Sequence, residues 1–374
     1  MNCEELTARC WAEISMDEIC GNYRRACEIS KTKVICVLKG NAYGLGAVKV
    51  CRALMGCGAT TFAVACGDEA EELLDACPGA EVLILGHVGE VQALRLIPRS
   101  AIFTVYSREQ GQRLARAAEQ AGRPARVHIK ADTGLHRLGF CGPNAVGEIL
   151  DLNAAGWLDI EGLYTHLALH NRASDELQFA RFDALRQALE SGGLRFRCVH
   201  ALDSIGMVRY PERAMDAVRT GAWLYGVTPR RAPKPSRCVG RFVARIAQLR
   251  RVAKSELIGY DDDHPLDRDS LIATVSAGYI DGTPRVGENW QVEIRGRRAN
   301  VIGIACMDQL MADVTDIPDV IEGDEVVFVG GGIDVEEYSK MGRFNHNEAW
   351  ARIGRRVPRI FYESGKPVRV RAEL

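Results

Sequence analysis

The chain has 374 residues, and its 48 basic and 49 acidic side chains give a formal net charge of −1. This balance provides no electrostatic reason to bind nucleic acid or an anionic membrane. The N-terminal segment lacks the apolar core of a signal peptide, and no later segment approaches the ~18 apolar residues of a membrane span. The thirteen cysteines contain no C-x-x-C pair, which favours reduced core residues over disulfides or a metal site. We therefore expect a cytoplasmic protein without a bound metal or membrane contact.

Short apolar runs alternate with longer stretches of helical periodicity over the first 230 residues. The runs lie at residues 33–38, 60–66, 81–86, 100–106, 126–132, 159–168, 197–204 and 217–226. Eight strands joined mostly by helical crossovers favour an α/β fold of the (β/α)8 TIM-barrel type over an open doubly wound sheet. In such a barrel, the carboxyl ends of the strands form the active face.

The pattern changes after the basic, proline-containing segment 230–237, which we interpret as a linker between domains. Beyond it, β-type segments follow one another with little helix until about residue 334. We predict a barrel domain over residues 12–233 and a smaller, mainly β domain over residues 238–374.

Lys39 lies where the first strand of the predicted barrel meets a run of small residues. Partial burial at this position would lower the pKa of its amine and make it a candidate base or Schiff-base nucleophile. On this pattern alone, an ordinary solvent-exposed lysine at a strand end is the more common outcome.

Seven segments resemble, in order, the motifs of the alanine racemase family. They are VLKGNAYGLG, KADTGLHRLG, GLYTHLA, VRTGAWLYG, SAGYIDGTPR, IACMDQLMADVTD and RRVPRIFY. The resemblance implies a pyridoxal 5'-phosphate enzyme of fold type III, with a barrel followed by a β domain on which a first strand, about residues 3–11, packs. It also implies a homodimer in which each active site uses residues of both subunits.

The resemblance assigns roles to individual residues. Lys39 would be the Schiff-base lysine and the acid–base group on one face of the substrate, with Tyr279 of the partner subunit on the opposite face. Arg219 would bond the pyridine nitrogen of the cofactor and, being always protonated, would keep that nitrogen unprotonated. His166 would orient Arg219, and Arg137 would bind the substrate carboxylate. Without the motifs, a structural arginine, a core histidine and a turn tyrosine remain the alternatives.

Further matches complete the expected site. Lys130 matches a lysine that is carbamylated in many family members and then supports Arg137. Met307 and Asp308 of the partner subunit would line the substrate pocket. The remaining residues expected to hold the cofactor are Tyr43, Ser204, Gly221, Ala222 and Tyr225.

Two residues depart from the family pattern. Asn347 stands where a tyrosine is usual, and asparagine there resembles the serine racemases of vancomycin-resistance systems. A shorter amide would enlarge the pocket and could hydrogen-bond a substrate hydroxyl. The alternative is a neutral substitution in an alanine racemase. Asp203 replaces the common asparagine before Ser204, and a carboxylate near a phosphate is unfavourable unless it is turned away.

We therefore predict a two-base racemase that interconverts L- and D-serine, and also alanine, and supplies D-amino acid for peptidoglycan precursors in vancomycin resistance. The alternative is a housekeeping alanine racemase. Because serine racemases of this kind occur fused to a membrane domain, the chain would be the cytoplasmic domain of such a protein or a free enzyme. The second-domain motifs disfavour a non-catalytic cofactor carrier. The lack of a cysteine-containing substrate loop disfavours a related decarboxylase.

Overall fold

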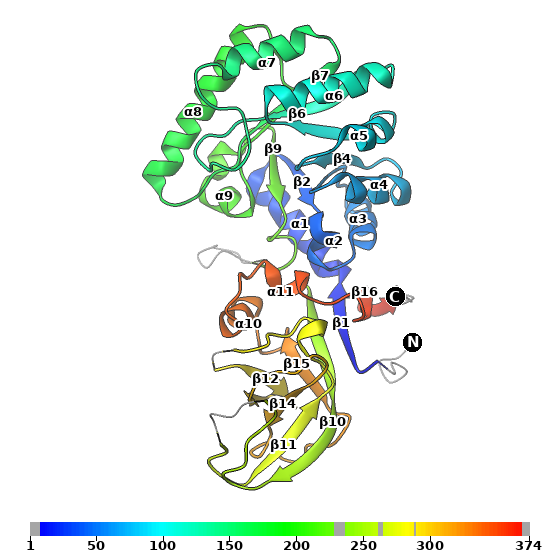
Figure 1. Cartoon of the computed structure of the whole chain (residues 1–374), viewed down its shortest axis with the longest axis vertical. Helices are drawn as coiled ribbons and strands as arrows, with labels where there is room; N and C mark the ends of the chain where they lie inside the picture. Colours follow the sequence, from blue (N-terminus) through cyan, green and yellow to red (C-terminus); the bar gives the residue numbers. More distant parts are fainter. Residues whose placement is uncertain (1–7, 228–235, 261–264, 288, 369–374) are drawn as a thin grey trace.

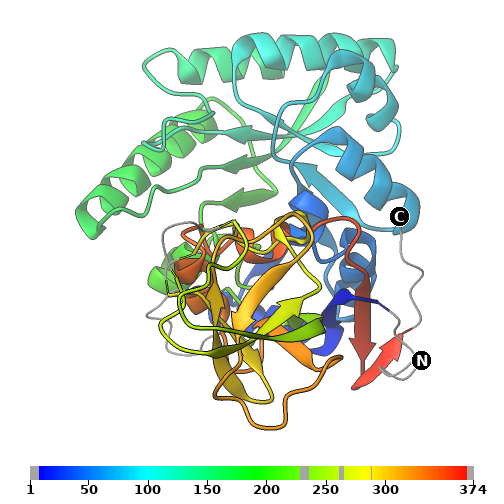
Figure 2. The same cartoon turned by 60° about the horizontal axis from the view of Figure 1, so that its bottom comes forward.

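The computed structural model describes residues 8–227, 236–260, 265–287 and 289–368. It consists of a barrel domain and a second, mainly β domain (Figure 1). Figures 1 and 2 show the sheet of the second domain on one side of the barrel.

The eight strands predicted from the apolar runs are all present and close into a parallel barrel, which confirms the predicted fold class. They are β2 (Lys33–Val37), β3 (Thr61–Val64), β4 (Glu81–Ile84), β5 (Ile102–Val105), β6 (Ala125–Lys130), β7 (Leu158–Tyr164), β8 (Cys198–His200) and β9 (Ala217–Thr220). The barrel closes where β9 pairs with β2, with Arg219 opposite Ile35.

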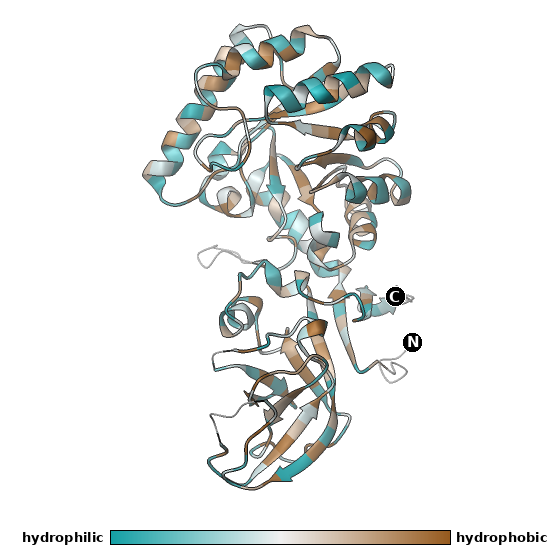
Figure 3. Cartoon of the chain, in the orientation of Figure 1, coloured by the Kyte–Doolittle hydropathy of each residue, from teal (hydrophilic) through white to brown (hydrophobic). Residues whose placement is uncertain are grey.

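Helices cover the outside of the barrel and bury their apolar faces against the strands (Figure 3). They are α1 (Met16–Ser30), α2 (Lys39–Tyr43), α3 (Ala47–Gly56), α4 (Gly67–Ala76), α5 (Glu90–Leu96), α6 (Arg108–Gln120), α7 (Ala145–Ala154), α8 (Arg172–Ser191), α9 (Ser204–Arg209) and the 3-10 helix η2 (Pro211–Arg213). Local signals fix several of their starts. The side chains of Ser107 and Asn171, for example, accept hydrogen bonds from the first turns of α6 and α8.

The second domain is built on one nine-stranded sheet with the order β11-β14-β13-β12-β15-β10-β1-β16-β17. The strands are β1 (Cys10–Ser15), β10 (Gly240–Val252), β11 (Ser270–Val275), β12 (Gln291–Ile294), β13 (Arg297–Ile302), β14 (Leu310–Asp313), β15 (Glu325–Val329), β16 (Arg359–Glu363) and β17 (Lys366–Val368). The helices α10 (Val335–Met341) and α11 (Glu348–Ala351) and the 3-10 helix η3 (Tyr279–Asp281) complete the domain.

The N-terminal strand belongs to the second domain. We expected it at about residues 3–11, whereas β1 spans Cys10–Ser15 and pairs with β10 and β16. Residues 12–15 therefore lie in this sheet, although the expected barrel domain began at residue 12. Residues 1–7 and 228–235, which include most of the expected linker at 230–237, lie outside the described residues. Within the described ranges, no helix has the length and apolar character needed to cross a membrane.

The two domains meet at the segments that follow β2 and β9 of the barrel. Arg359 donates from Nε to the carbonyl oxygen of Gly44 at 3.1 Å, and Trp350 donates from Nε1 to the carbonyl oxygen of Tyr225 at 3.1 Å. A Cβ on Gly46 would lie 2.8 Å from the ring of Phe361. The second domain therefore packs directly against the segment that follows Lys39.

Candidate active site

Lys39 lies at the carboxyl end of β2, on the face where barrel enzymes carry their active sites. The helix that it begins, α2, is a left-handed turn. The φ values of Gly40, Asn41, Ala42 and Tyr43 are 65°, 55°, 53° and 55°. A left-handed backbone costs about 1–2 kcal/mol for each residue that carries a Cβ. Three of the four residues carry one, so contacts around the turn must hold it.

Side chains from both domains brace this turn. Asn41 Oδ1 accepts from the N–H of Ala47 at 2.7 Å, and Arg359 binds the carbonyl oxygen of Gly44. A Cβ on Gly44 would clash with the carbonyl oxygen of Trp350. The geometry at Lys39 thus depends on contacts far away in the sequence.

The amine of Lys39 is set up to act as a base. The side chain is exposed in this chain, yet desolvation of the amine, followed by the charge of Arg137, lowers its pKa, while the carboxylate of Glu69 opposes the shift. A lower pKa leaves more of the neutral, proton-accepting amine near neutral pH.

Arg219 is buried at the end of β9, with 4% of its surface exposed. Its Nη2 donates to the carbonyl oxygens of Thr165 and Ala201 at 2.7 and 3.0 Å, and lies 3.4 Å from Nδ1 of His166. Its Nη1 donates to Nδ1 of His200 at 2.5 Å. It forms no ion pair with a carboxylate in the part of the chain that the structure describes. Burial lowers its pKa, but a guanidinium remains charged in proteins.

The buried charge of Arg219 keeps the neighbouring imidazoles neutral. Burial first, and Arg219 second, lower the pKa of His166 to about 3 and that of His200 far below its usual value. A neutral imidazole has one donor and one acceptor nitrogen. Because Nδ1 of each ring faces the guanidinium as an acceptor, each Nε2 carries the proton.

This proton order continues through the barrel. Nε2 of His200 lies 2.9 Å from Nδ1 of His128, and Nε2 of His128 lies 3.7 Å from Oε1 of Glu161. Burial disfavours the Glu161 carboxylate, but His128 and then Arg126 and Arg197 prevail and lower its pKa to about 2. The sequence analysis missed His128, His200 and Glu161. The available signal was polar residues inside strands that are otherwise apolar.

Arg137 lies on a loop whose shape is held by the side chain of Asp132. Asp132 Oδ1 accepts from the N–H groups of Gly134, Leu135 and His136 at 3.0, 3.1 and 3.1 Å. Burial works against the ionised form, but the bonds from His136 and Gly134 prevail and lower the pKa of Asp132. The loop holds Arg137 near enough to Lys39 to influence the pKa of its amine.

Lys130, at the end of β6, is 5% exposed and forms no ion pair among the described residues. Burial first, and then the charges of Arg137 and Arg219, lower the pKa of its amine to about 8. A lysine between two guanidinium groups is in a place that favours an anion. The charge interactions of Lys39, Lys130, Arg137, His166 and Arg219 therefore place these five predicted residues in one site.

Beside this group lies a cradle of hydroxyl and backbone donors. Ser204 Oγ accepts from the N–H groups of Gly221 and Trp223, each at 3.2 Å. A Cβ on Gly221 would lie 2.6 Å from the hydroxyl of Tyr43, so glycine allows this hydroxyl to approach the backbone. The expected phosphate ligands Tyr43, Ser204, Gly221 and Ala222 thus lie together at the ends of β8 and β9 and on α2.

Asp203 is turned away from this cradle. Its Oδ1 accepts from the N–H groups of Ile205 and Gly206 at 2.9 and 2.8 Å, and it is the N-cap of α9. A carboxylate is favourable at the start of a helix because it satisfies free donors and the helix dipole. The departure from the family pattern therefore has a local structural role.

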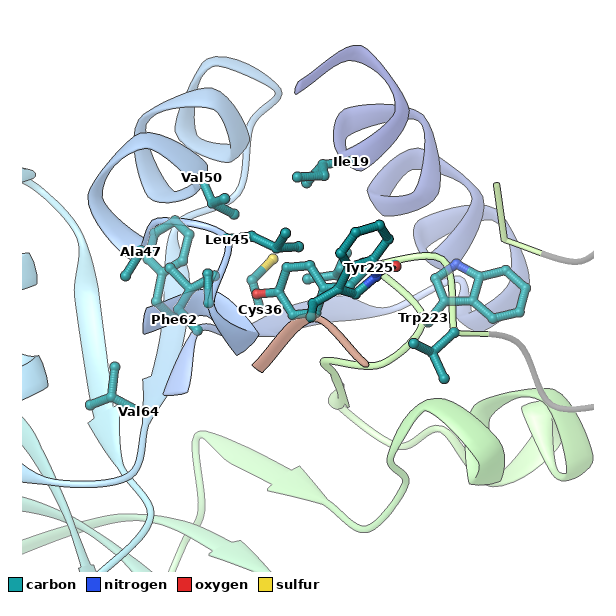
Figure 4. Packing of buried hydrophobic residues seen from close by; sticks show 14 of the residues in the cluster. Ile19, Cys36, Leu45, Ala47, Val50, Phe62, Val64, Trp223 and Tyr225 are labelled. Carbon is teal, nitrogen blue, oxygen red and sulfur yellow. Dashed lines mark hydrogen bonds between the residues drawn. The ribbon is translucent and has the colours of Figure 1, made fainter. Parts of the chain in front are cut away.

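Tyr225 differs from the expectation. Its hydroxyl donates to the carbonyl oxygen of Val37 at 2.8 Å, and its ring lies 4.9 Å from that of Tyr43. The side chain is fully buried in a cluster with Trp223 and Cys36 (Figure 4). Tyr225 therefore supports β2 through this hydrogen bond and supports Tyr43 through the ring contact.

Tyr279, Met307 and Asp308 form a separate group on the second domain. The N–H of Tyr279 donates to the carbonyl oxygen of Cys306 at 3.2 Å, and Asp308 pairs with Arg356 at 2.5 Å. Tyr279 and Met307 are 36% and 51% exposed. Over the described ranges, no hydrogen bond or ion pair joins these three residues to the Lys39 group.

Asn347 is exposed at the N-cap of α11, and its own N–H donates to Asn345 Oδ1 at 2.9 Å. The side-chain amide of Asn347 makes no hydrogen bond to another described residue. No group of three or more histidine, cysteine, aspartate or glutamate side chains is placed to hold a metal ion in the described parts of the chain.

Comparison with known proteins identifies the family. Residues 14–229 match the model of the alanine racemase N-terminal domain, and residues 239–361 match that of the C-terminal domain. The chain belongs to the alanine racemase family. It is 35% identical to the alanine racemase of Desulforamulus reducens, over 94% of this chain and 98% of that protein.

Solved structures agree with this assignment. The chain is similar to the alanine racemase of Clostridium difficile 630, with a TM-score of 0.94 and 29% identity over 99% of this chain and 100% of the other. It also resembles the alanine racemase of Bartonella henselae with covalently bound pyridoxal phosphate. There the TM-score is 0.87 and the identity 27%, over 95% of this chain and 100% of that chain.

Pyridoxal phosphate is the cofactor of this family, and the residues fit it. The hydroxyl groups of Tyr43 and Ser204 both lie close to the backbone at Gly221, and such hydroxyl groups suit a phosphate dianion. Arg219 offers a fixed cation to a ring nitrogen, and Lys39 offers an amine with a lowered pKa.

We predict that Lys130 carries a carbamate. Carbon dioxide reacts with a neutral amine, and the pKa of about 8 means that the neutral fraction rises as the pH rises through this value. Carbon-13 NMR in labelled bicarbonate should show a protein-bound carbamate signal that weakens as the pH falls below about 8.

The assignment to Lys130 has a matched control. The signal should disappear in Lys130→Met and persist in Lys39→Ala. The second variant is a matched control, because the pKa of Lys39 is also lowered in the unaltered protein. A signal that survives Lys130→Met, or none in the unaltered protein, would contradict the prediction.

Proposed function

We propose that this protein is a pyridoxal-phosphate-dependent alanine racemase that supplies D-alanine for cell-wall synthesis. The observation that carries the proposal is that one site contains a base, Lys39, and a buried cation, Arg219, that has no carboxylate partner among the described residues. The names of the relatives support alanine as the substrate.

When bound, pyridoxal phosphate supplies an electron-withdrawing ring that makes a proton at the substrate's α-carbon removable. Lys39 holds the cofactor at rest. During turnover, its free Nζ takes or returns the α-proton on one face of the substrate. The braced turn fixes the direction of the lysine, which is needed for proton transfer to one carbon.

Arg219 and His166 set the electronic character of the site. The charged guanidinium of Arg219 would face the ring nitrogen of the cofactor and would keep that nitrogen unprotonated, which would make electron withdrawal weak. Weak withdrawal favours rapid return of the proton over side reactions. His166 keeps a neutral ring with its proton on Nε2, and accepts from Arg219 at Nδ1.

Arg137 binds and orients the substrate carboxylate. The anionic form of Lys130 would pair with it and fix the guanidinium in place. The loop formed by Asp132 then determines where the substrate's α-carbon lies relative to Lys39.

The second acid–base group would come from another copy of the chain. Tyr279 of the partner subunit would face Lys39 across the substrate, with Met307 and Asp308 of the partner subunit lining the pocket. The exposure of Tyr279 and Met307, and their separation from the Lys39 group within one chain, support a homodimer with shared sites.

Alanine replaces serine as the favoured substrate. Asn347 alone suggested serine and vancomycin resistance, whereas the relatives across nearly the whole chain carry the name alanine racemase. Asn347 remains a reason to test serine, since a shorter amide leaves room for a hydroxyl.

The purified protein should racemise L-alanine, with the D-enantiomer followed by chiral chromatography and Lys39→Ala as the inactive control. Absence of alanine turnover would contradict the proposed function.

The Asn347 variant tests substrate selection. If the side-chain amide of Asn347 contacts a substrate hydroxyl, Asn347→Tyr should shift the ratio of kcat/KM for alanine to that for serine towards alanine, by about 1–3 kcal/mol. An unchanged ratio would remove Asn347 from substrate selection.

Subunit mixing tests the shared site. Lys39→Ala and Tyr279→Phe should each be nearly inactive alone. A mixed dimer would contain one site with both groups intact, so random mixing should restore about a quarter of the activity. If each site lies within one chain, mixing the two variants should restore nothing.

A further inference from the structure

Glu69 lies in the first turn of α4 and reaches two strand ends at once. Its Oε1 accepts from the N–H of Gly40 at 2.6 Å, and its Oε2 accepts from the N–H of Ala65 at 2.7 Å. Gly40 follows Lys39 directly after β2, and Ala65 follows β3. One carboxylate therefore joins the ends of adjacent barrel strands beside the active-site lysine.

A helix cap explains only half of this arrangement. A glutamate in the first turn commonly accepts from the N–H of the helix's own N-cap. Here the N-cap of α4 is Cys66, and Glu69 binds the residue before it with one oxygen. The other oxygen points away from α4 and accepts from the N–H of Gly40, which is not part of that helix.

The bond to Gly40 falls at the start of the left-handed turn. Gly40 is the first of five consecutive residues with positive φ, and the turn closes with a bond from the N–H of Gly44, the fifth, to the carbonyl oxygen of Gly40 at 2.7 Å. Asn41 and Arg359 brace the far end of the turn. Glu69 is the side chain that holds its near end, next to Lys39.

The carboxylate also acts on the lysine through its charge. The amine of Lys39 has Arg137 as a cationic neighbour and Glu69 as an anionic one. The anion favours the protonated amine, whereas desolvation and Arg137 favour the neutral amine.

We propose that Glu69 is a positioning residue for Lys39: its carboxylate fixes the strained turn through the N–H of Gly40 and sets the charge balance around the amine. The inference rests on the proposed function, in which Lys39 is the acid–base group, but its geometric part does not require turnover.

The test compares Glu69→Gln and Glu69→Asp with Glu71→Gln. Glu71 lies on the same helix and pairs with Arg95 at 2.9 Å, away from the lysine turn. Hydrogen–deuterium exchange of the cofactor-bound protein, resolved at Gly40 by fragmentation of the peptide that covers the turn, reports on the clamp. The pH profile of kcat for alanine reports on the charge, because the amine of Lys39 is free only when substrate is bound.

Glutamine has one acceptor oxygen for the two N–H groups that the carboxylate binds, and a bond to it lacks the negative charge. In Glu69→Gln, the amide of Gly40 should therefore exchange about 10-fold faster. The limb of the pH profile that requires the neutral amine should move to lower pH by about half to one pH unit. Removal of the anion makes the protonated amine less favourable and so lowers its pKa. Glu69→Asp keeps the charge but shortens the reach, so exchange should quicken while the limb stays in place. Glu71→Gln should match the unaltered protein in both.

Unchanged exchange at Gly40 in Glu69→Gln, or equal acceleration in Glu71→Gln, would overturn the clamp. An unmoved limb together with faster exchange would overturn the charge role. If the unaltered protein does not racemise alanine, the proposed function fails, and the exchange comparison still decides whether Glu69 holds the turn.

Discussion

The site depends on one buried cation, Arg219, that has no carboxylate partner in the described parts of the chain. Removing a guanidinium from water is costly unless polar groups replace its hydration. Here carbonyl oxygens at the ends of β7 and β8 and two imidazoles do so. The arrangement holds His166 and His200 in their neutral forms and fixes their protons on Nε2. The charge of Arg219 remains available to a ligand, because no protein anion neutralises it among the described residues.

The second constraint is the strained turn at Lys39. It joins the barrel to the second domain, since Arg359 and the backbone of Trp350 pack against Gly44. The second domain therefore holds the lysine of its own barrel in place, which gives a physical reason for the two domains to occur together.

The sequence predicted the barrel well, because eight apolar runs with helical crossovers leave few alternative folds. It also placed Lys39 correctly at the end of the first barrel strand. It did not predict the left-handed turn, because long-range contacts hold that conformation and only Gly40 and Gly44 hinted at it. His128, His200 and Glu161 were hidden inside strands, where sequence alone does not separate a buried network from isolated polar residues.

Three further residues could not be interpreted from the sequence pattern alone. Asp203 was a concern beside a phosphate, yet the start of α9 takes its carboxylate. Tyr225 was expected to hold the cofactor, yet a backbone carbonyl takes its hydroxyl. Asn347 suggested serine, but substrate preference is a difference between two affinities that a whole pocket sets, including residues from a partner.

The central claim is that Lys39 carries the cofactor on the braced turn. The most direct test is to reduce the cofactor-bound protein with borohydride, which makes the lysine–cofactor bond permanent, and to locate the modified residue by peptide mass spectrometry. We predict a single modified lysine, Lys39, in the peptide that contains GNAYGLG. Modification of another lysine, or none, would contradict the account.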